Sequence, residues 1–335
     1  MELRGINYDT GMALDDFHSR KAFDEDAVRR DMAAIAEDLH TTAVRVSGDD
    51  PERILVAGRH AAQAGLDVWF SPFPYDLEAA ALVDYLTGAA ERAALLRRET
   101  EREVVLVLGC EMTLFCKGFV PGEGLPGRAA TMTDPGTWAT EEGRAPLLAG
   151  FQRARDTQRE TVAAARRLFG GRLTYASGMW EQVDWDQFDI VSVDAYRDAG
   201  NAARYAEELR AYHRFGRPVV VTEFGCCTYR GAADRGGLGW TIVTEDRTIP
   251  TEYERDEAEQ VRYLHELDAV FDEERMAGAF WFTFAGFELP HRPDDPAHDL
   301  DLASYGLVAM RPDGGWDPKL AFHAVAALYG GQPAR

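Results

Sequence analysis

The stretch Val104-Val105-Leu106-Val107-Leu108-Gly109-Cys110-Glu111 is a run of mostly aliphatic residues that ends at a carboxylic acid. A second stretch of the same kind, Val219-Val220-Val221-Thr222-Glu223, lies in the second half of the chain. Continuous aliphatic runs of this length are typical of strands buried on both faces of a parallel sheet. The two stretches therefore predict parallel strands, each with a glutamate at its carboxyl end.

Further short β-rich segments alternate with longer helical patterns along the rest of the chain. In order, the eight predicted strands run from Leu3 to Tyr8, Ala43 to Ser47, Asp67 to Ser71, Glu103 to Cys110, Leu173 to Ser177, Ile190 to Tyr196, Pro218 to Phe224 and Ala279 to Phe284. Eight parallel strands with helices between them close into a barrel, whereas open doubly wound sheets usually have about five or six strands. We therefore expect residues 1–335 to form a single α/β domain, a (β/α)8 TIM barrel.

The segments between the strands have the spacing of amphipathic helices. The clearest one places Val28, Met32, Ile35 and Leu39 on one face, with Asp24 positioned to accept the first free backbone N–H groups. The other predicted helices run from Pro51 to Ala64, Leu77 to Arg98, Leu147 to Phe169, Asn201 to Phe215, Thr251 to Glu274 and Pro318 to Tyr329, with a short one around Gln182 to Gln187.

Three long loops account for the length beyond a minimal barrel. They run from Cys116 to Gly150 after the fourth strand, Cys227 to Thr251 after the seventh and Ala285 to Leu307 after the eighth. Because all three follow strands, they lie on the carboxyl-end face, where barrel active sites are built. The loops predict the walls of a cleft.

The composition excludes several classes of partner. The chain has 36 Lys and Arg against 57 Asp and Glu, a net charge of -21, which repels nucleic acid and anionic membranes alike. No apolar run reaches the roughly 18 residues needed to span a bilayer. The negative charge also favours a neutral substrate over an anionic one.

The sequence also bears on targeting, metals and cofactors. Residues 1–8 lack the basic region and apolar core of a secretory signal, so a cytoplasmic protein is expected. The four cysteines, Cys110, Cys116, Cys226 and Cys227, form no CxxC pair, and we expect no bound metal. The glycines of 236–239 do not follow a strand as a phosphate loop requires, so no cofactor is predicted. The oligomeric state stays open.

Glu111 and Glu223 are the candidate catalytic residues. They end the fourth and seventh strands and therefore project from separate parts of the rim toward a common space. Paired carboxyl groups are the minimal equipment for cleaving a glycosidic bond: one protonates the leaving oxygen and the other attacks or stabilises the anomeric carbon. Asp9, Asp194 and Glu288 lie on the same face as further acids.

With these glutamates, the chain resembles the retaining glycoside hydrolases of clan A, among them mannanase-like and endoglucanase-like members. The resemblance implies Glu223 as nucleophile and Glu111 as acid/base. It extends to Arg45 at the end of the second strand and Tyr196 at the end of the sixth, which would position Glu223. It also implies Trp281 on the eighth strand as the floor of a sugar subsite, and Trp180 is a further candidate sugar platform.

One residue departs from the family pattern. The resemblance implies an asparagine before the acid/base glutamate, where it binds the 2-hydroxyl of the sugar, and here Cys110 stands in that place. A thiol is a poor hydrogen-bond donor. The alternatives to hydrolysis of an oligosaccharide or small glycoside are therefore a biosynthetic enzyme, such as a transglycosylase, lyase or other acid/base catalyst, or a non-catalytic sugar-binding barrel.

Overall fold

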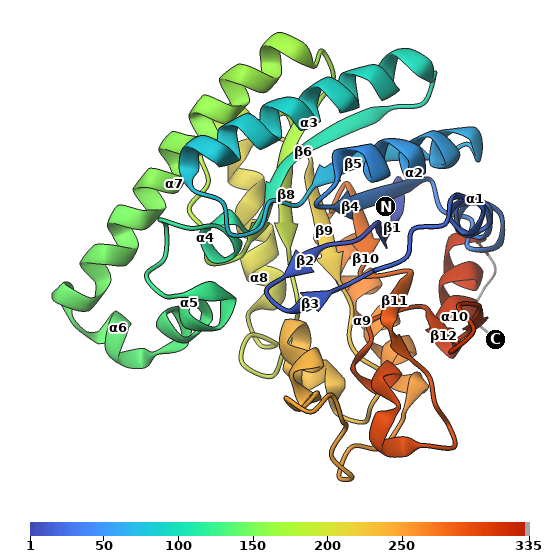
Figure 1. Cartoon of the computed structure of the whole chain (residues 1–335). Coiled ribbons are helices and arrows are strands. Elements are labelled where there is room, and N and C mark those ends of the chain that lie inside the picture. The colour runs from blue at the N-terminus through green and yellow to red at the C-terminus, as the bar shows by residue number, and fades with distance from the viewer. Residues whose placement is uncertain (332–335) are drawn as a thin grey trace.

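The computed structural model describes residues 1–331, and its centre is a closed barrel of eight parallel strands (Figure 1). In chain order the strands are β1 (Leu3–Asp9), β4 (Ala43–Gly48), β5 (Asp67–Pro72), β6 (Val104–Cys110), β7 (Leu173–Gly178), β8 (Val191–Asp194), β9 (Val219–Phe224) and β10 (Gly278–Trp281). Each pairs with the strand before and after it, and β10 closes on β1. The predicted (β/α)8 barrel and all eight strands are confirmed.

Alternate residues of the strands face two different cores. Trp69, Val107 and Phe280 belong to the cluster that fills the barrel, where the rings of Trp69 and Phe280 lie 4.8 Å apart. Residues of the opposite parity pack against the helices in the larger outer cluster. Gly5 is required at the crowded inner face, because a Cβ there would lie 2.2 Å from the Phe280 ring.

The helices surround the barrel and cover its outer face (Figure 1). They are α1 (Glu25–Ala33, continued by the π-helical turn η1, Ala34–Asp38), α2 (Pro51–Gln63), α3 (Ala79–Glu99), α7 (Glu141–Leu168), α8 (Tyr205–Arg210, continued by the 3-10 turn η3, Ala211–Phe215), α9 (Glu257–Glu273) and α10 (Leu320–Tyr329), with the short 3-10 turn η2 (Trp185–Gln187) after β7. Asp24 caps α1 as predicted, accepting from the Ala27 N–H.

Two helices begin six residues away from the predicted start, further than the others. Helix α7 starts before Leu147, because the Thr140 side chain caps it by accepting from the Gly143 N–H. Helix α9 starts after Thr251, where the Asp256 side chain accepts from the Ala258 N–H. A side-chain cap satisfies a free donor at the first turn and so determines where the helix begins.

The three long loops contain structure that the sequence prediction missed. The first holds α5 (Gly124–Thr133) and α6 (Pro135–Ala139), with α4 (Met112–Phe115) directly before it, and the second holds η4 (Ala232–Ile242). The third holds β11 (Ala285–Pro290), which pairs in a small sheet with β12 (Val308–Met310) and β13 (Trp316–Pro318), and the turns η5 (Pro296–His298) and η6 (Leu300–Ala303). A hairpin of β2 (Ala13–Leu14) and β3 (Phe17–His18) follows β1.

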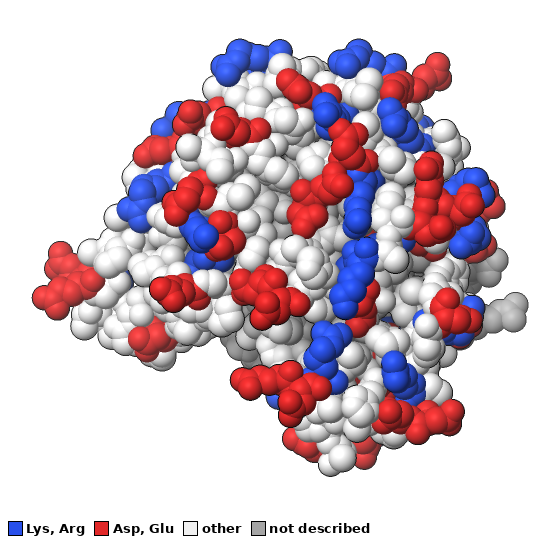
Figure 2. Space-filling model, in the orientation of Figure 1, with Lys and Arg blue, Asp and Glu red and all other residues white. Residues whose placement is uncertain are grey.

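The surface is charged and mixed in sign. Figure 2 shows acidic and basic side chains interspersed on the face seen in Figure 1. Within residues 1–331, none of the helices is both long enough and apolar enough to cross a membrane.

Candidate active site

Glu223 lies at the carboxyl end of β9 and is held by two side chains. Its Oε1 accepts a hydrogen bond from Arg45 Nη1 at 2.6 Å, and its Oε2 accepts one from the Tyr196 hydroxyl at 2.8 Å. Arg45 comes from β4 and Tyr196 follows β8, so three strands converge on one carboxylate. The Glu223 side chain keeps 14% of its surface exposed, which leaves it open to the rim of the barrel.

Arg45 is fully buried beneath Glu223. Its Nε donates to the Ser71 hydroxyl at 3.1 Å and its Nη1 also donates to Asn7 Oδ1 at 3.2 Å. Burial on its own lowers the pKa of the guanidinium, but the charge of Glu223 opposes this and the net direction is upward. Arg45 therefore stays positively charged and supports the carboxylate from below.

Glu111 follows β6 in the left-handed backbone region, with φ 40°. Its N–H donates to the Ala176 carbonyl at 2.9 Å, and its own carbonyl accepts from the N–H groups of Leu114 and Phe115, which begins α4. A non-glycine residue in this region costs about 1–3 kcal/mol and persists only where its surroundings hold it. These bonds determine the direction in which the Glu111 side chain leaves the rim.

Glu181, in the loop after β7, ties down the residues that follow Glu111. Its Oε1 accepts from the Thr113 N–H at 3.1 Å and from the Thr113 hydroxyl at 2.6 Å. The Tyr175 hydroxyl donates to Glu181 Oε2 at 2.8 Å while it accepts from the Met112 N–H at 2.7 Å. Sequence reasoning missed Glu181, although an acid just beyond the end of a barrel strand was the signal used for Glu111 and Glu223.

The environment of Glu111 favours its protonated form. Burial raises the pKa of the Glu111 carboxyl well above its ordinary value of 4.5, and the nearby Glu223 carboxylate raises it further. Glu223 has a guanidinium partner, whereas no ion pair of Glu111 is found in residues 1–331. Two carboxyl groups in such different environments can take the separate roles of acid and nucleophile.

Cys110 lies below the rim, between Glu223 and Asp194. Its Sγ is 3.3 Å from Asp194 Oδ2 and 3.9 Å from Glu223 Oε1. Only 2% of Cys110 is exposed, so the thiol does not face the cleft as a substrate-binding residue would. The Cys110 thiol and the carboxyl groups of Asp194 and Glu223 lie close enough together to hold a metal ion. The Arg45 guanidinium, however, already contacts these carboxyl groups and would repel a cation.

The aromatic residues correct one prediction. Trp281 is fully buried, donates its indole N–H to the Tyr305 carbonyl at 3.0 Å and packs against Phe224 in the outer core. Trp281 therefore cannot form the floor of a sugar subsite, because Phe280 points into the barrel and the next side chain points outward into the outer core. Phe282, which the sequence prediction missed, is half-buried and packs edge to face against Tyr196.

Trp180 lies on the rim beside the residues that follow Glu111. Its indole N–H donates to the Thr113 hydroxyl at 3.3 Å, and its ring lies against Gly178 at the end of β7, where a Cβ would come within 2.5 Å of it. The side chain remains 38% exposed. Trp180 therefore has an exposed ring beside Thr113, and its role as a sugar platform stays a prediction.

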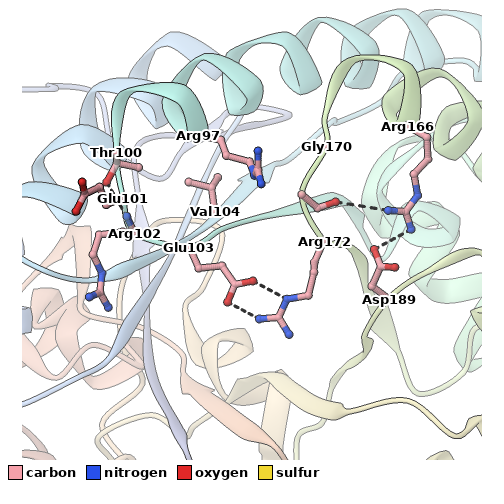
Figure 3. A pocket seen from close by; sticks show the side chains of 11 residues that line it. Arg97, Thr100, Glu101, Arg102, Glu103, Val104, Arg166, Gly170, Arg172 and Asp189 are labelled. Carbon is pink, nitrogen blue, oxygen red and sulfur yellow. Dashed lines mark hydrogen bonds and ion pairs between the residues drawn. The ribbon is translucent and has the colours of Figure 1, made fainter.

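A large cavity of about 660 Å³ lies at the opposite end of the barrel, around the N-terminal ends of β6 and β7 (Figure 3). It is lined by ion pairs: Arg172 is bonded to Glu103, and Arg166 to Asp189 at 2.7 Å. These groups are paired and solvated, and active sites of such barrels lie at the other face. We therefore place the site at the rim around Glu111 and Glu223.

Comparison with solved structures finds the same kind of fold in several glycoside hydrolases. A scan against protein-family models gives no match, and a search of curated proteins gives none. Among solved structures, a GH113 β-1,4-mannanase is similar with a TM-score of 0.64 and 16% identity over 99% of both chains.

Two further structures extend the comparison. The apo structure of a β-glucosidase is similar with a TM-score of 0.59 and 13% identity, over 99% of both chains. A β-glucuronidase from Ruminococcus gnavus has a TM-score of 0.58 and 15% identity, and the match covers 98% of this chain and 50% of that one. At such low identities the likeness concerns the fold alone.

Proposed function

We propose that the protein is a glycoside hydrolase that cleaves a neutral glycoside by a retaining double displacement, with the whole chain acting as one catalytic domain. The observation that carries this proposal is the pair of rim glutamates in opposite environments. Glu223 is held by Arg45 and Tyr196, while burial and neighbouring charges raise the pKa of Glu111. A retaining glycosidase needs one ionised and one protonated carboxyl group at the start of its cycle.

In the first step Glu223 attacks the anomeric carbon of the sugar. The bond to the leaving oxygen breaks as Glu111 donates its proton to that oxygen, and the sugar becomes an ester of Glu223. In the second step ionised Glu111 takes a proton from a water molecule, which attacks the anomeric carbon and releases Glu223 as a carboxylate. Both glutamates end in the protonation states in which they began.

The surroundings of Glu223 support its role as nucleophile. Arg45 and Tyr196 each donate to a different oxygen of the carboxylate. Charge-assisted bonds of this kind are strong and directional, so they fix the attacking group in one orientation. Preorganised donors of this kind also stabilise the carboxylate when it leaves in the second step.

The aromatic residues suggest how the substrate lies. Phe282 packs edge to face against Tyr196, whose hydroxyl donates to Glu223. Trp180 lies beside Thr113, two residues after the acid/base glutamate. We place the leaving group of the substrate over Trp180, since Glu111 must reach the leaving oxygen. The acidic groups around the cleft favour a neutral sugar.

A panel of aryl glycosides tests the proposal. We expect release of the chromophore from at least one neutral sugar, and proton NMR of the first product formed should show the same anomeric configuration as the substrate. A 2-fluoro glycoside with a good leaving group should label Glu223, which peptide mass spectrometry would detect. First-formed product of the opposite configuration would contradict the retaining mechanism.

The same panel separates the alternatives that Cys110 raises. Because the thiol is buried, the usual amide contact with the sugar 2-hydroxyl is missing. Transfer of the sugar to an added acceptor in preference to water would support a transglycosylase. Stabilisation of the protein against heat by sugars without turnover would support a binding protein.

A further inference from the structure

A third carboxyl group lies beneath the two rim glutamates. Asp194 is the register partner of Glu223 across β8 and β9, and its side chain has no exposed surface. Its closest charged neighbour of opposite sign is Arg45 Nη1, at 3.8 Å from Asp194 Oδ1, whereas the same nitrogen is 2.6 Å from Glu223. No hydrogen-bond partner for Oδ1 is found among residues 1–331.

The charges of this cluster do not balance. One guanidinium, Arg45, faces Asp194, Glu223 and Glu111. Its short contact goes to Glu223, so Asp194 is left buried without a close cation, and its neighbouring donors are uncharged: the Cys110 thiol at 3.3 Å and the Thr222 hydroxyl. Burying an unpaired carboxylate costs far more free energy than burying a neutral carboxylic acid. A carboxyl group in this position therefore keeps its proton.

The thiol of Cys110 has one proton and two possible acceptors, Asp194 Oδ2 at 3.3 Å and Glu223 Oε1 at 3.9 Å. If Asp194 is a carboxylate, the nearer oxygen takes the thiol proton. If Asp194 is a neutral acid, its own O–H can donate to the sulfur, and the thiol proton is free to point at Glu223. The protonation state of Asp194 therefore decides which carboxyl group Cys110 serves.

We propose that Asp194 is a positioning residue that holds a proton in the resting enzyme, donates it to Cys110 Sγ and so directs the thiol S–H toward Glu223. Glu223 then has three donors: Arg45, Tyr196 and Cys110. In this arrangement Cys110 supports the nucleophile from below. The role in catalysis rests on the proposed function, whereas the protonation of Asp194 does not.

The groups that face Asp194 are consistent with a retained proton. Glu223 comes from β9, and Arg45 comes from β4. Cys110 ends β6 and Glu111 follows it, while Tyr196 follows β8. The register partner of Asp194 on β7 is Gly178, which has no side chain. Burial raises the pKa of Asp194, the charge of Glu223 raises it further, and Arg45 opposes them without reversing the direction.

Infrared spectroscopy tests the protonation without any substrate. The spectrum of the wild type minus that of Asp194→Asn should contain the carbonyl stretch of a neutral carboxylic acid at pH 7. The S–H band of Cys110, identified by its loss in Cys110→Ala, should lie at the position of a hydrogen-bonded thiol in the wild type. Only carboxylate bands in the difference spectrum would overturn the proposal.

Kinetics test the positioning role. An asparagine amide can donate to sulfur as the neutral acid does, so Asp194→Asn should retain kcat within about tenfold, while Asp194→Ala should lose about 10²-fold or more. The acid limb of kcat/KM should coincide in the wild type and Asp194→Asn. If Asp194 is ionised instead, its replacement removes a negative neighbour of Glu223 and should move that limb down by about one pH unit or more.

Two controls keep the tests independent. Thermal melts of both Asp194 variants show whether either loses activity by failing to fold. If no glycoside is turned over by the wild type, the proposed function fails, but the infrared test still decides the state of Asp194. A carboxylic-acid band together with equal losses of kcat in Asp194→Asn and Asp194→Ala would support the proton on Asp194 but overturn its positioning role.

Discussion

Strand β6 has a glutamate at each end, and the two lie in opposite surroundings. At the base of the barrel, Glu103 precedes the strand and forms an ion pair with Arg172, with side chains 41% and 44% exposed. At the rim, Glu111 follows the strand and has no ion pair among residues 1–331, while its neighbours Asp194 and Glu223 share one guanidinium, Arg45.

The difference separates a structural use of charge from a chemical one. A solvated pair of this kind contributes about 0–1 kcal/mol to stability. A buried excess of carboxyl groups costs stability and shifts proton affinities, and perturbed groups of this kind are common at catalytic sites. A cavity lies at the base, but the unbalanced charge lies at the rim.

The largest effect is expected from Glu223→Gln. The amide cannot attack the anomeric carbon, so we expect kcat/KM to fall on the order of 10⁴-fold or more, with the fold retained in circular dichroism. The matched control at the base is Glu103→Gln, whose activity should equal that of the wild type. Equal activities of Glu223→Gln and the wild type would sink the assignment.

The next effect is expected from changes to Glu111. Loss of the general acid in Glu111→Gln should lower kcat/KM by about 10²–10⁴-fold, and less for aryl glycosides whose leaving group needs no proton. Azide should restore turnover of an activated substrate by Glu111→Ala and yield a glycosyl azide. Failure of azide to change the rate, with correct folding, would argue against the acid/base role.

The free energy of unfolding should respond differently to the loss of Arg45 and to the loss of Arg172. Arg45→Met leaves Glu223 and Asp194 buried without their guanidinium, so we expect the free energy of unfolding to fall by about 3–5 kcal/mol. Arg172→Met breaks only a solvated pair, and we expect a change of less than about 1 kcal/mol. Urea denaturation of both variants measures the contrast, and losses of similar size would erase the distinction between rim and base.

The smallest effect concerns pH. The pKa of Glu111 is raised in the folded protein above its ordinary value of 4.5. Above pH 4.5 the unfolded chain releases this proton while the folded protein keeps it, so the stability associated with Glu111 is present below pH 4.5 and declines as the pH rises. Glu111→Gln should therefore unfold at the same urea concentration as the wild type near pH 4, and be more stable by about 1–2 kcal/mol near pH 8.

Glu103→Gln provides the comparison for that measurement. Its difference from the wild type should stay below about 1 kcal/mol at both pH values, because Glu103 is a solvated partner of Arg172. A pH-independent difference for Glu111→Gln would show that Glu111 ionises like an exposed carboxyl group.

Much of the fold was predictable because its signals are local. The aliphatic runs that end at Glu111 and Glu223 marked two strands, and counting similar segments predicted the barrel. The convergence of Arg45 and Tyr196 on Glu223 was a prediction from resemblance, and the described contacts bring these three residues together.

Sequence by itself determined the strands, their number and the acids at their ends, because each depends on neighbours along the chain. Only the tertiary structure decided that Phe282 and not Trp281 lies beside Tyr196, because the phase of β10 is set by packing of Phe280 inside the barrel. The contacts of Cys110 with Asp194 and Glu223 likewise join three strands. Such contacts depend on register across the closed sheet, and no local pattern carries that information.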